Sequence, residues 1–166
     1  MKLLLGGGTL TKRGFTNVDI LPLPGVDVVA DITKGLPFPD NSVDEVAADY
    51  FLPYVPDVVF VMQEIYRVCQ NGARVIIKVP YFKSSFACKD PTTKYFFTER
   101  TFEQFDHTYV ERGLMPEYNL KCNYKTEKVT YNYVNRGTRF VPFVGFLRRF
   151  LWDIVKNIVV ELRVVK

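Results

Sequence analysis

The chain contains few of the residues that metal sites and disulfide frameworks need. It has one histidine, His107, and three cysteines, Cys69, Cys88 and Cys122, with no CxxC spacing among them. An odd number of cysteines among apolar neighbours is typical of reduced, buried side chains. Structural zinc sites need several closely spaced cysteine and histidine ligands. We therefore predict a cytoplasmic protein with no disulfide framework and no bound metal.

Dense charge of one sign and long apolar runs are missing as well. The net charge of +4 is spread over scattered lysines and arginines, without the basic block that favours nucleic-acid binding. The opening run Leu3-Leu4-Leu5 is shorter than the roughly 7–15 apolar residues of a signal peptide. Asp153 and Lys156-Asn157 interrupt the apolar stretch 140–160, which argues against a spanning helix. We predict no leader, no transmembrane segment and no nucleic-acid partner.

The composition is that of an ordinary folded domain. Of the 166 residues, 48% are apolar and 24% are charged, and the length suits one hydrophobic core. We therefore expect a single domain over residues 1–166.

Short apolar runs bounded by glycine and proline predict the first half of the fold. The separation of the first two runs by only residues 6–15 predicts an abbreviated crossover helix. Asp57 is expected to cap a helix that has an apolar face and ends at Gly72. The predicted strands are residues 3–5, 15–20, 26–30, 43–48 and 73–79.

The second half is less periodic. Residues 80–98 predict a long loop, and Thr101 with Gln104 resembles a capping box that opens a helix ended by Gly113. Residues 118–124 alternate as a strand does, residues 143–158 are expected to be helical, and residues 159–165 predict a last strand. The expected fold is a three-layer α/β domain whose mainly parallel, twisted sheet has an antiparallel C-terminal edge strand.

Candidate binding residues follow the first three predicted strands. Ligands of open parallel sheets bind beyond the carboxyl ends of the strands. Gly6, Gly7 and Gly8 follow the first strand and allow close approach to the backbone. Asp19 and Asp31 follow the second and third strands, and an acid at the end of the second strand can accept hydrogen bonds from both hydroxyls of a ribose. Each of these residues alone is equally typical of a plain turn.

Several segments in this order resemble the cofactor-binding half of class I S-adenosylmethionine-dependent methyltransferases, which have a Rossmann-like fold. The resemblance covers residues 3–82 well and extends loosely to about residue 105. The segments are Leu5-Gly6-Gly7-Gly8-Thr9, Gly14 to Ile20, Gly25 to Asp31, Gly35 to Val46, Glu64 to Val68 and Asn71 to Pro80.

The resemblance implies S-adenosyl-L-methionine as cofactor and methyl transfer to an unidentified, small-molecule acceptor. The glycines Gly6, Gly7 and Gly8 would pass along the methionine part of the cofactor, and Asp19 would hold the ribose. The Asp31 carboxylate would accept the adenine amino group. The remaining cofactor contacts implied are Ile20 and Ile32 against the adenine ring, and Asp49 and Tyr50 beside the sulfonium.

The acceptor side departs from the family pattern. Pro53-Tyr54 replaces the common Glu-His after the fourth strand, and Thr93 stands where related chains often have histidine. Asp49, Tyr81 and His107 are candidate catalytic bases. For His107, a purely structural role is the main alternative.

Two alternative functions remain open for this chain. One is a catalytically silent module that binds the cofactor. The other is a protein-interaction or membrane-surface module acting through residues 140–160, with weak contact to a bilayer. A homodimer also remains an alternative. The aromatic residues between Tyr81 and Phe97 are expected to belong to the core or to a lid over the acceptor.

Overall fold

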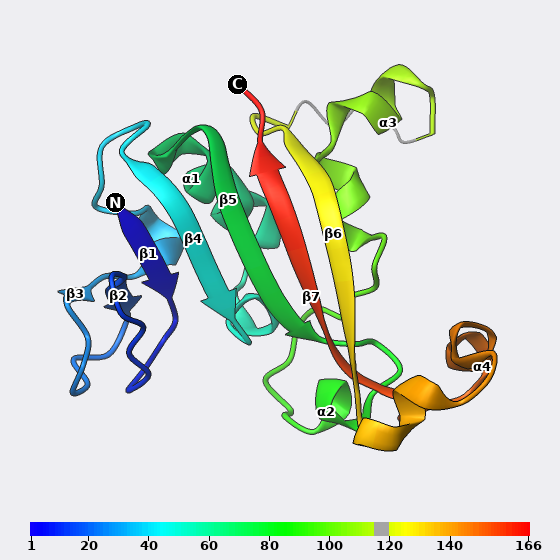
Figure 1. The fold of residues 1–166 in the computed structure, drawn as a ribbon. Coiled ribbons are helices and arrows are strands. Elements are labelled where there is room, and N and C mark those ends of the chain that lie inside the picture. Colours follow the sequence, from blue (N-terminus) through cyan, green and yellow to red (C-terminus); the bar gives the residue numbers. More distant parts are fainter. Residues whose placement is uncertain (115–119) are drawn as a thin grey trace.

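Seven strands form one sheet in the order β3-β2-β1-β4-β5-β7-β6 (Figure 1). The computed structural model describes residues 1–114 and 120–166, the side chains of 136 and 139 excepted. The neighbours from β3 to β5 pair in parallel, whereas β7 runs antiparallel to both β5 and β6. The strands are β1 (Lys2–Leu5), β2 (Thr16–Asp19), β3 (Val28–Val29), β4 (Val43–Asp49), β5 (Cys69–Pro80), β6 (Tyr124–Tyr133) and β7 (Val155–Val164).

The predicted α/β class and mainly parallel sheet are confirmed. The last strand is antiparallel, as predicted, but it lies between β5 and β6 and is not the edge. Its inward-facing residues Val160, Leu162 and Val164 are fully or almost fully buried. β7 takes this central position by pairing with β5 on one side and with β6 on the other.

The helix after β4 is the main helix on the sheet. In α1 (Val58–Val68), Asp57 caps the N-terminus as predicted, because its Oδ1 accepts the Phe60 N–H at 2.9 Å. The helix ends at Val68, and Gly72, predicted to be its stop, belongs to β5 with a φ of 78°. The other helices are η1 (Ile32–Lys34), η2 (Leu52–Tyr54), α2 (Ser85–Cys88), η3 (Thr101–Phe105), α3 (His107–Glu111), η4 (Arg136–Phe140) and α4 (Val144–Phe150).

The abbreviated crossover helix predicted between β1 and β2 is not formed, because this connection contains turns and no helix. The Asn17 side chain holds this connection, since its Nδ2 lies 2.9, 3.0 and 2.8 Å from the carbonyl oxygens of Gly8, Leu10 and Gly25. One buried amide therefore binds two carbonyls of this connection and one carbonyl of the loop between β2 and β3.

Only one face of the sheet is covered by helices in the described parts of the chain. Residues of α1 and η3, such as Ile65 and Phe102, share one hydrophobic cluster with the inward side chains of β1, β4, β5 and β7. Figure 1 shows these helices behind the sheet. Among the described residues, no helix therefore forms the expected third layer.

The opposite face is charged instead. Lys2 pairs with Glu45 at 2.7 Å, and Glu161 lies 3.1 Å from Arg74 and 3.8 Å from Lys128. Such cross-strand pairs tolerate water, so this face needs no helix to cover it.

Three predictions for the second half were wrong. Thr101 opens the 3₁₀ helix η3 without capping it, and the helix α3 that follows is capped by Asp106. The strand predicted for 118–124 begins only at Tyr124 as β6, and residues 115–119 lie outside the described parts. The helix predicted for 143–158 ends at Phe150, because residues from Val155 onward pair in β7.

Candidate functional site

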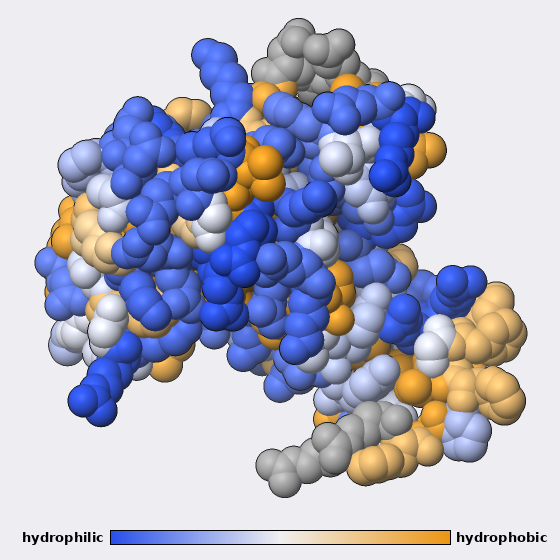
Figure 2. Space-filling view, turned by 45° about the horizontal axis from the view of Figure 1, so that its top comes forward, coloured by the Kyte–Doolittle hydropathy of each residue, from blue (hydrophilic) through white to orange (hydrophobic). Residues whose placement is uncertain are grey.

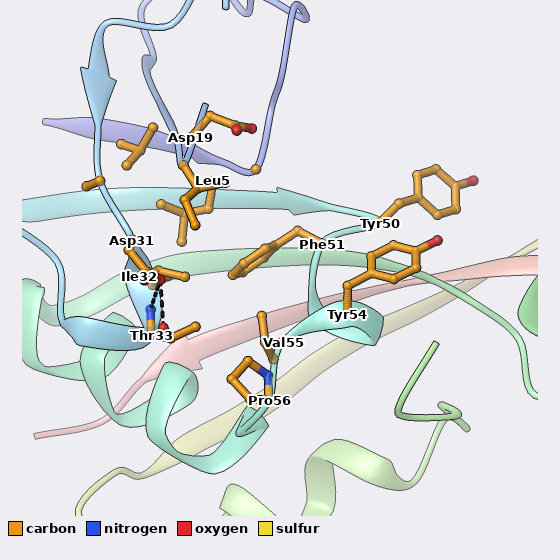
Figure 3. A pocket seen from close by; sticks show the side chains of 14 residues that line it. Leu5, Asp19, Asp31, Ile32, Thr33, Tyr50, Phe51, Tyr54, Val55 and Pro56 are labelled. Carbon is orange, nitrogen blue, oxygen red and sulfur yellow. Dashed lines mark hydrogen bonds between the residues drawn. The ribbon is translucent and has the colours of Figure 1, made fainter. Parts of the chain in front are cut away.

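A cavity of about 540 Å³ opens at the carboxyl ends of β1, β2 and β4 (Figure 3). This volume lies within the usual range of small-ligand sites, roughly 300–1,000 Å³. Its walls are mainly apolar, with the carboxylates of Asp19 and Asp31 as their charged groups. The lining residues are Leu5, Gly6, Val18, Asp19, Ile20, Ala30, Asp31, Ile32, Thr33, Tyr50, Phe51, Tyr54, Val55 and Pro56.

The glycine turn after β1 leaves no room for a side chain at Gly6 or Gly7. Gly6 has a φ of 63°, and a Cβ there would lie 2.7 Å from the Cβ of Phe51. A Cβ on Gly7 would lie 2.4 Å from Oδ1 of Asn17. Gly6 contributes to the cavity wall, whereas Gly7 and Gly8 are not among its lining residues.

The Asp19 carboxylate is fixed by the backbone on both sides of it. Its Oδ2 accepts the Gly8 N–H at 2.9 Å, and its Oδ1 accepts the Leu21 N–H at 3.0 Å. Each oxygen keeps a second lone pair for a ligand. A carboxylate held by two N–H groups has its orientation set before a ligand arrives.

The Asp31 carboxylate is also oriented by its own turn. Its Oδ1 accepts both the N–H and the hydroxyl of Thr33, at 3.0 and 2.6 Å, as it caps η1. The hydrogen bond from the Thr33 hydroxyl is the main reason that the pKa of Asp31 lies below its ordinary value. Asp31 is thus ionised at neutral pH, and Oδ2, with Lys34 Nζ 3.5 Å away, has capacity to accept from a ligand.

A second cavity of about 650 Å³ shares two tyrosines with the first. Tyr50 and Tyr54 line both cavities, and Figure 3 shows their rings pointing to the same side. Tyr50 has a φ of 57°, and burial followed by the Asp49 charge raises its pKa. The other lining residues are Pro80, Phe86, Lys89, Asp90, Pro91 and Lys156.

Of the implied cofactor residues, the structure brings Gly6, Asp19, Ile20, Asp31, Ile32 and Tyr50 together around the first cavity. Asp49 is not part of its wall and lies 3.9 Å from Lys78. Gly7 and Gly8 do not line the cavity, and Gly8 binds the Asp19 carboxylate through its N–H.

The other two candidate bases lie elsewhere. Tyr81 is buried, its ring packs edge-on against Tyr131, and burial followed by Glu99 raises its pKa to about 12. It is therefore protonated at neutral pH. His107 begins α3, where its N–H donates to Asn123, at the opposite end of the sheet from the cavity (Figure 1).

Phe51, Val55 and Pro56 were not foreseen as lining residues. They follow β4, so the rule for strand ends could have suggested them. The turn η2 between them carries the chain back over the cavity, and such a turn is not visible in an apolar stretch of sequence.

The fold, with its cavity at the strand ends, is that of class I S-adenosylmethionine-dependent methyltransferases. Residues 12–77 match the family model described as a methyltransferase domain. The chain aligns over 98% of its length with an S-adenosylmethionine-dependent methyltransferase of Archaeoglobus fulgidus, covering 85% of that chain. The TM-score is 0.61 at 14% identity, a likeness of fold.

The cyclase SpnF has the same fold with a TM-score of 0.61 and 14% identity, covering 99% of this chain and 75% of that one. The fold alone therefore does not decide the reaction.

A curated relative matches part of the chain at higher identity. The demethylmenaquinone methyltransferase of Anoxybacillus flavithermus is 35% identical over 74 residues, which is 45% of this chain. The match spans only 28% of that relative's length.

Proposed function

We propose that this chain is an enzyme that binds S-adenosyl-L-methionine and transfers its methyl group to a small-molecule acceptor, with residues 1–166 acting as one domain. The observation that carries the proposal is that Asp19 and Asp31 line one mainly apolar cavity together with Gly6 of the glycine turn. The family match over residues 12–77 includes both carboxylates.

The residues present fit this cofactor. Among the described residues, no lysine or arginine lines the cavity, so its charge suits a cationic ligand. A dinucleotide would instead call for exposed backbone N–H groups or a lysine at its diphosphate. Asp19 would bind the ribose hydroxyls and Asp31 the adenine amino group, with Ile20 and Ile32 on the ring faces.

When bound, the cofactor supplies a methyl group already activated by a positive sulfur. The chain's own residues then have to align the acceptor, and alignment can supply much of the acceleration. Tyr50 and Tyr54 are placed for this because they separate the two cavities. None of the candidate bases Asp49, Tyr81 and His107 lines either cavity, whereas the Asp90 carboxylate lines the second one.

The second cavity is our candidate acceptor site. Lys156 lies 4.3 Å and Lys89 5.8 Å from the centroid of the Phe86 ring, so two cations flank an aromatic surface. This pairing favours an acceptor that combines a flat ring with negative charge.

Calorimetric titration with S-adenosylhomocysteine tests the donor site. We expect saturable binding that Asp19→Ala weakens. No binding to the intact chain would refute the proposal.

A catalytically silent module is the second candidate. The Pro53-Tyr54 replacement favours it. Incubation with methyl-labelled S-adenosylmethionine and a library of ring-bearing acids separates the two, since binding without product under all conditions would support the module.

A further inference from the structure

Large apolar side chains gather on one projecting segment at the carboxyl end of the sheet. We name Phe143, Phe146, Phe150, Leu151 and Trp152 the aromatic prominence. Their exposed fractions are 84, 61, 64, 47 and 61%, respectively. Figure 2 shows hydrophobic surface gathered at the lower right, and Figure 1 places α4 at that side. Contiguous exposed apolar surface of this kind marks an interaction site.

The prominence has an ordered geometry. The rings of Phe146 and Phe150 lie one helical turn apart, with centroids 4.7 Å apart. The Asp153 N–H donates to the Lys83 carbonyl at 2.9 Å, and Oδ1 of Asp153 accepts the Ser85 N–H at 2.6 Å. Lys83 Nζ also donates to the Arg149 carbonyl. These bonds hold the apolar side chains outward and fix the segment beside α2.

Basic side chains outnumber acidic ones around the prominence. Residues 140–152 contain Arg148 and Arg149 and neither aspartate nor glutamate, and Oδ1 of Asp153, which follows them, accepts the Ser85 N–H. Within this segment Arg148 packs on the Tyr131 ring at 3.8 Å, whereas Arg149 is exposed. Lys89 and Lys156 of the second cavity lie on the neighbouring elements.

We propose that the aromatic prominence docks on an anionic lipid bilayer, with its rings inserted among the headgroups. Aromatic and leucine side chains flanked by arginine are the composition that binds membrane interfaces. A second copy of the chain fits less well, because a symmetric contact would bring the arginines of both copies together. Among the described residues, no helix is long and apolar enough to cross a bilayer, so the contact lies at the surface.

Docking would also orient the candidate acceptor site. Phe86, which lines the second cavity, neighbours Ser85, and Ser85 is bonded to Asp153 beside the prominence. The cavity would therefore open close to the headgroups. The docking itself does not depend on cofactor binding and is tested without it.

Trp152 provides the direct test, because the chain contains one tryptophan. Vesicles of phosphatidylcholine with phosphatidylglycerol should shift its emission to shorter wavelength, and brominated lipids should quench it. The protein should float with these vesicles, and less with phosphatidylcholine alone. Unchanged emission together with no flotation would overturn the proposal. A blue shift that depends on protein concentration without lipid would overturn it in favour of self-association.

Variants separate the apolar and electrostatic contributions. Phe143→Ser with Phe146→Ser should lower the vesicle partition constant about tenfold or more, since binding scales with buried apolar area. Leu114→Ser, at a residue 60% exposed near the other end of the sheet, should leave it unchanged. Arg149→Glu should lower it about tenfold at low salt, and Lys125→Glu on β6 should not. The proposal would be overturned if Leu114→Ser lowered the partition constant as much as the double phenylalanine variant. It would also be overturned if Lys125→Glu lowered it as much as Arg149→Glu.

Discussion

The carboxylate of Asp19 accepts the backbone N–H of Gly8 at 2.9 Å. The acid that ends β2 therefore fixes the glycine turn that follows β1. This bond gives Asp19 two roles, one toward the backbone and one toward a ligand in the cavity that it lines.

Replacing Asp19 should weaken ligand binding, whereas replacing a neighbouring carboxylate outside the cavity should not. We expect Asp19→Ala to weaken S-adenosylhomocysteine binding about ten- to a hundredfold, the scale of ~1.5–3 kcal/mol for charge-assisted hydrogen bonds. Asp27→Ala is the matched control, since its Oδ2 accepts the Asn17 N–H at 2.7 Å but Asp27 does not line the cavity. Calorimetry should show normal affinity for Asp27→Ala, and equal losses in both variants would contradict the assignment of Asp19 to the ribose.

Gly7→Ala should destabilise the chain through the Asn17 anchor. The new Cβ would lie 2.4 Å from Oδ1 of Asn17, and forcing such an overlap costs about 1–3 kcal/mol. Gly145→Ala in α4 has open space around it and should be neutral or stabilising by up to ~1 kcal/mol. Urea unfolding of both variants measures the two changes in stability. An unchanged unfolding midpoint for Gly7→Ala would contradict the prediction.

The buried Tyr124 hydroxyl joins β6 to α1. It donates to the Met62 carbonyl at 2.7 Å, and the ring is fully buried. Tyr124→Phe should lower the free energy of unfolding by about 1 kcal/mol. The Tyr95 hydroxyl donates to the Pro56 carbonyl at the surface, so Tyr95→Phe should cost clearly less. Chemical denaturation that ranked the two variants in the reverse order would refute this reading.

Glu64 should make stability depend on pH in the acid range. Its Oε2 accepts the Leu36 N–H and an Arg67 N–H, both at 2.9 Å. The hydrogen bond from Arg67 is the main cause that lowers the pKa of Glu64 from its ordinary value of 4.5. A carboxyl whose pKa is lowered on folding stabilises the fold above its unfolded pKa. That contribution is lost as the pH falls through the folded pKa, below 4.5.

The test of this linkage compares Glu64→Gln with the parent chain across pH. The difference in unfolding free energy should be largest near neutral pH and should shrink below pH 4.5. A difference that stayed constant down to the acid limit would show that the Glu64 charge does not contribute.

The first half of the chain was predictable because its signals are local. The Asp57 cap, the apolar face of α1 and the short strands next to glycine or proline each depend on neighbours in sequence. Asp19 and Asp31 could be placed because parallel strands end at the same edge of a sheet.

The second half depended on partners far along the chain. The apolar pattern of residues 155–158 fits a helix as well as a strand, so the sequence predicts a helix there. Pairing with β5 and β6 makes these residues part of a strand. The placement of His107 likewise required the path of the chain after η3, which no local signal gives.

The sequence by itself determined the class of fold and the turns that carry the glycines and two carboxylates, since these follow from residue type and short-range spacing. Only the tertiary structure decided that β7 lies between β5 and β6. It also decided that one face of the sheet carries ion pairs and, among the described residues, no helix. The exposure of the aromatic prominence was decided in the same way. Those features result from long-range pairing and burial, where the same side chains have several acceptable neighbours until the whole sheet forms.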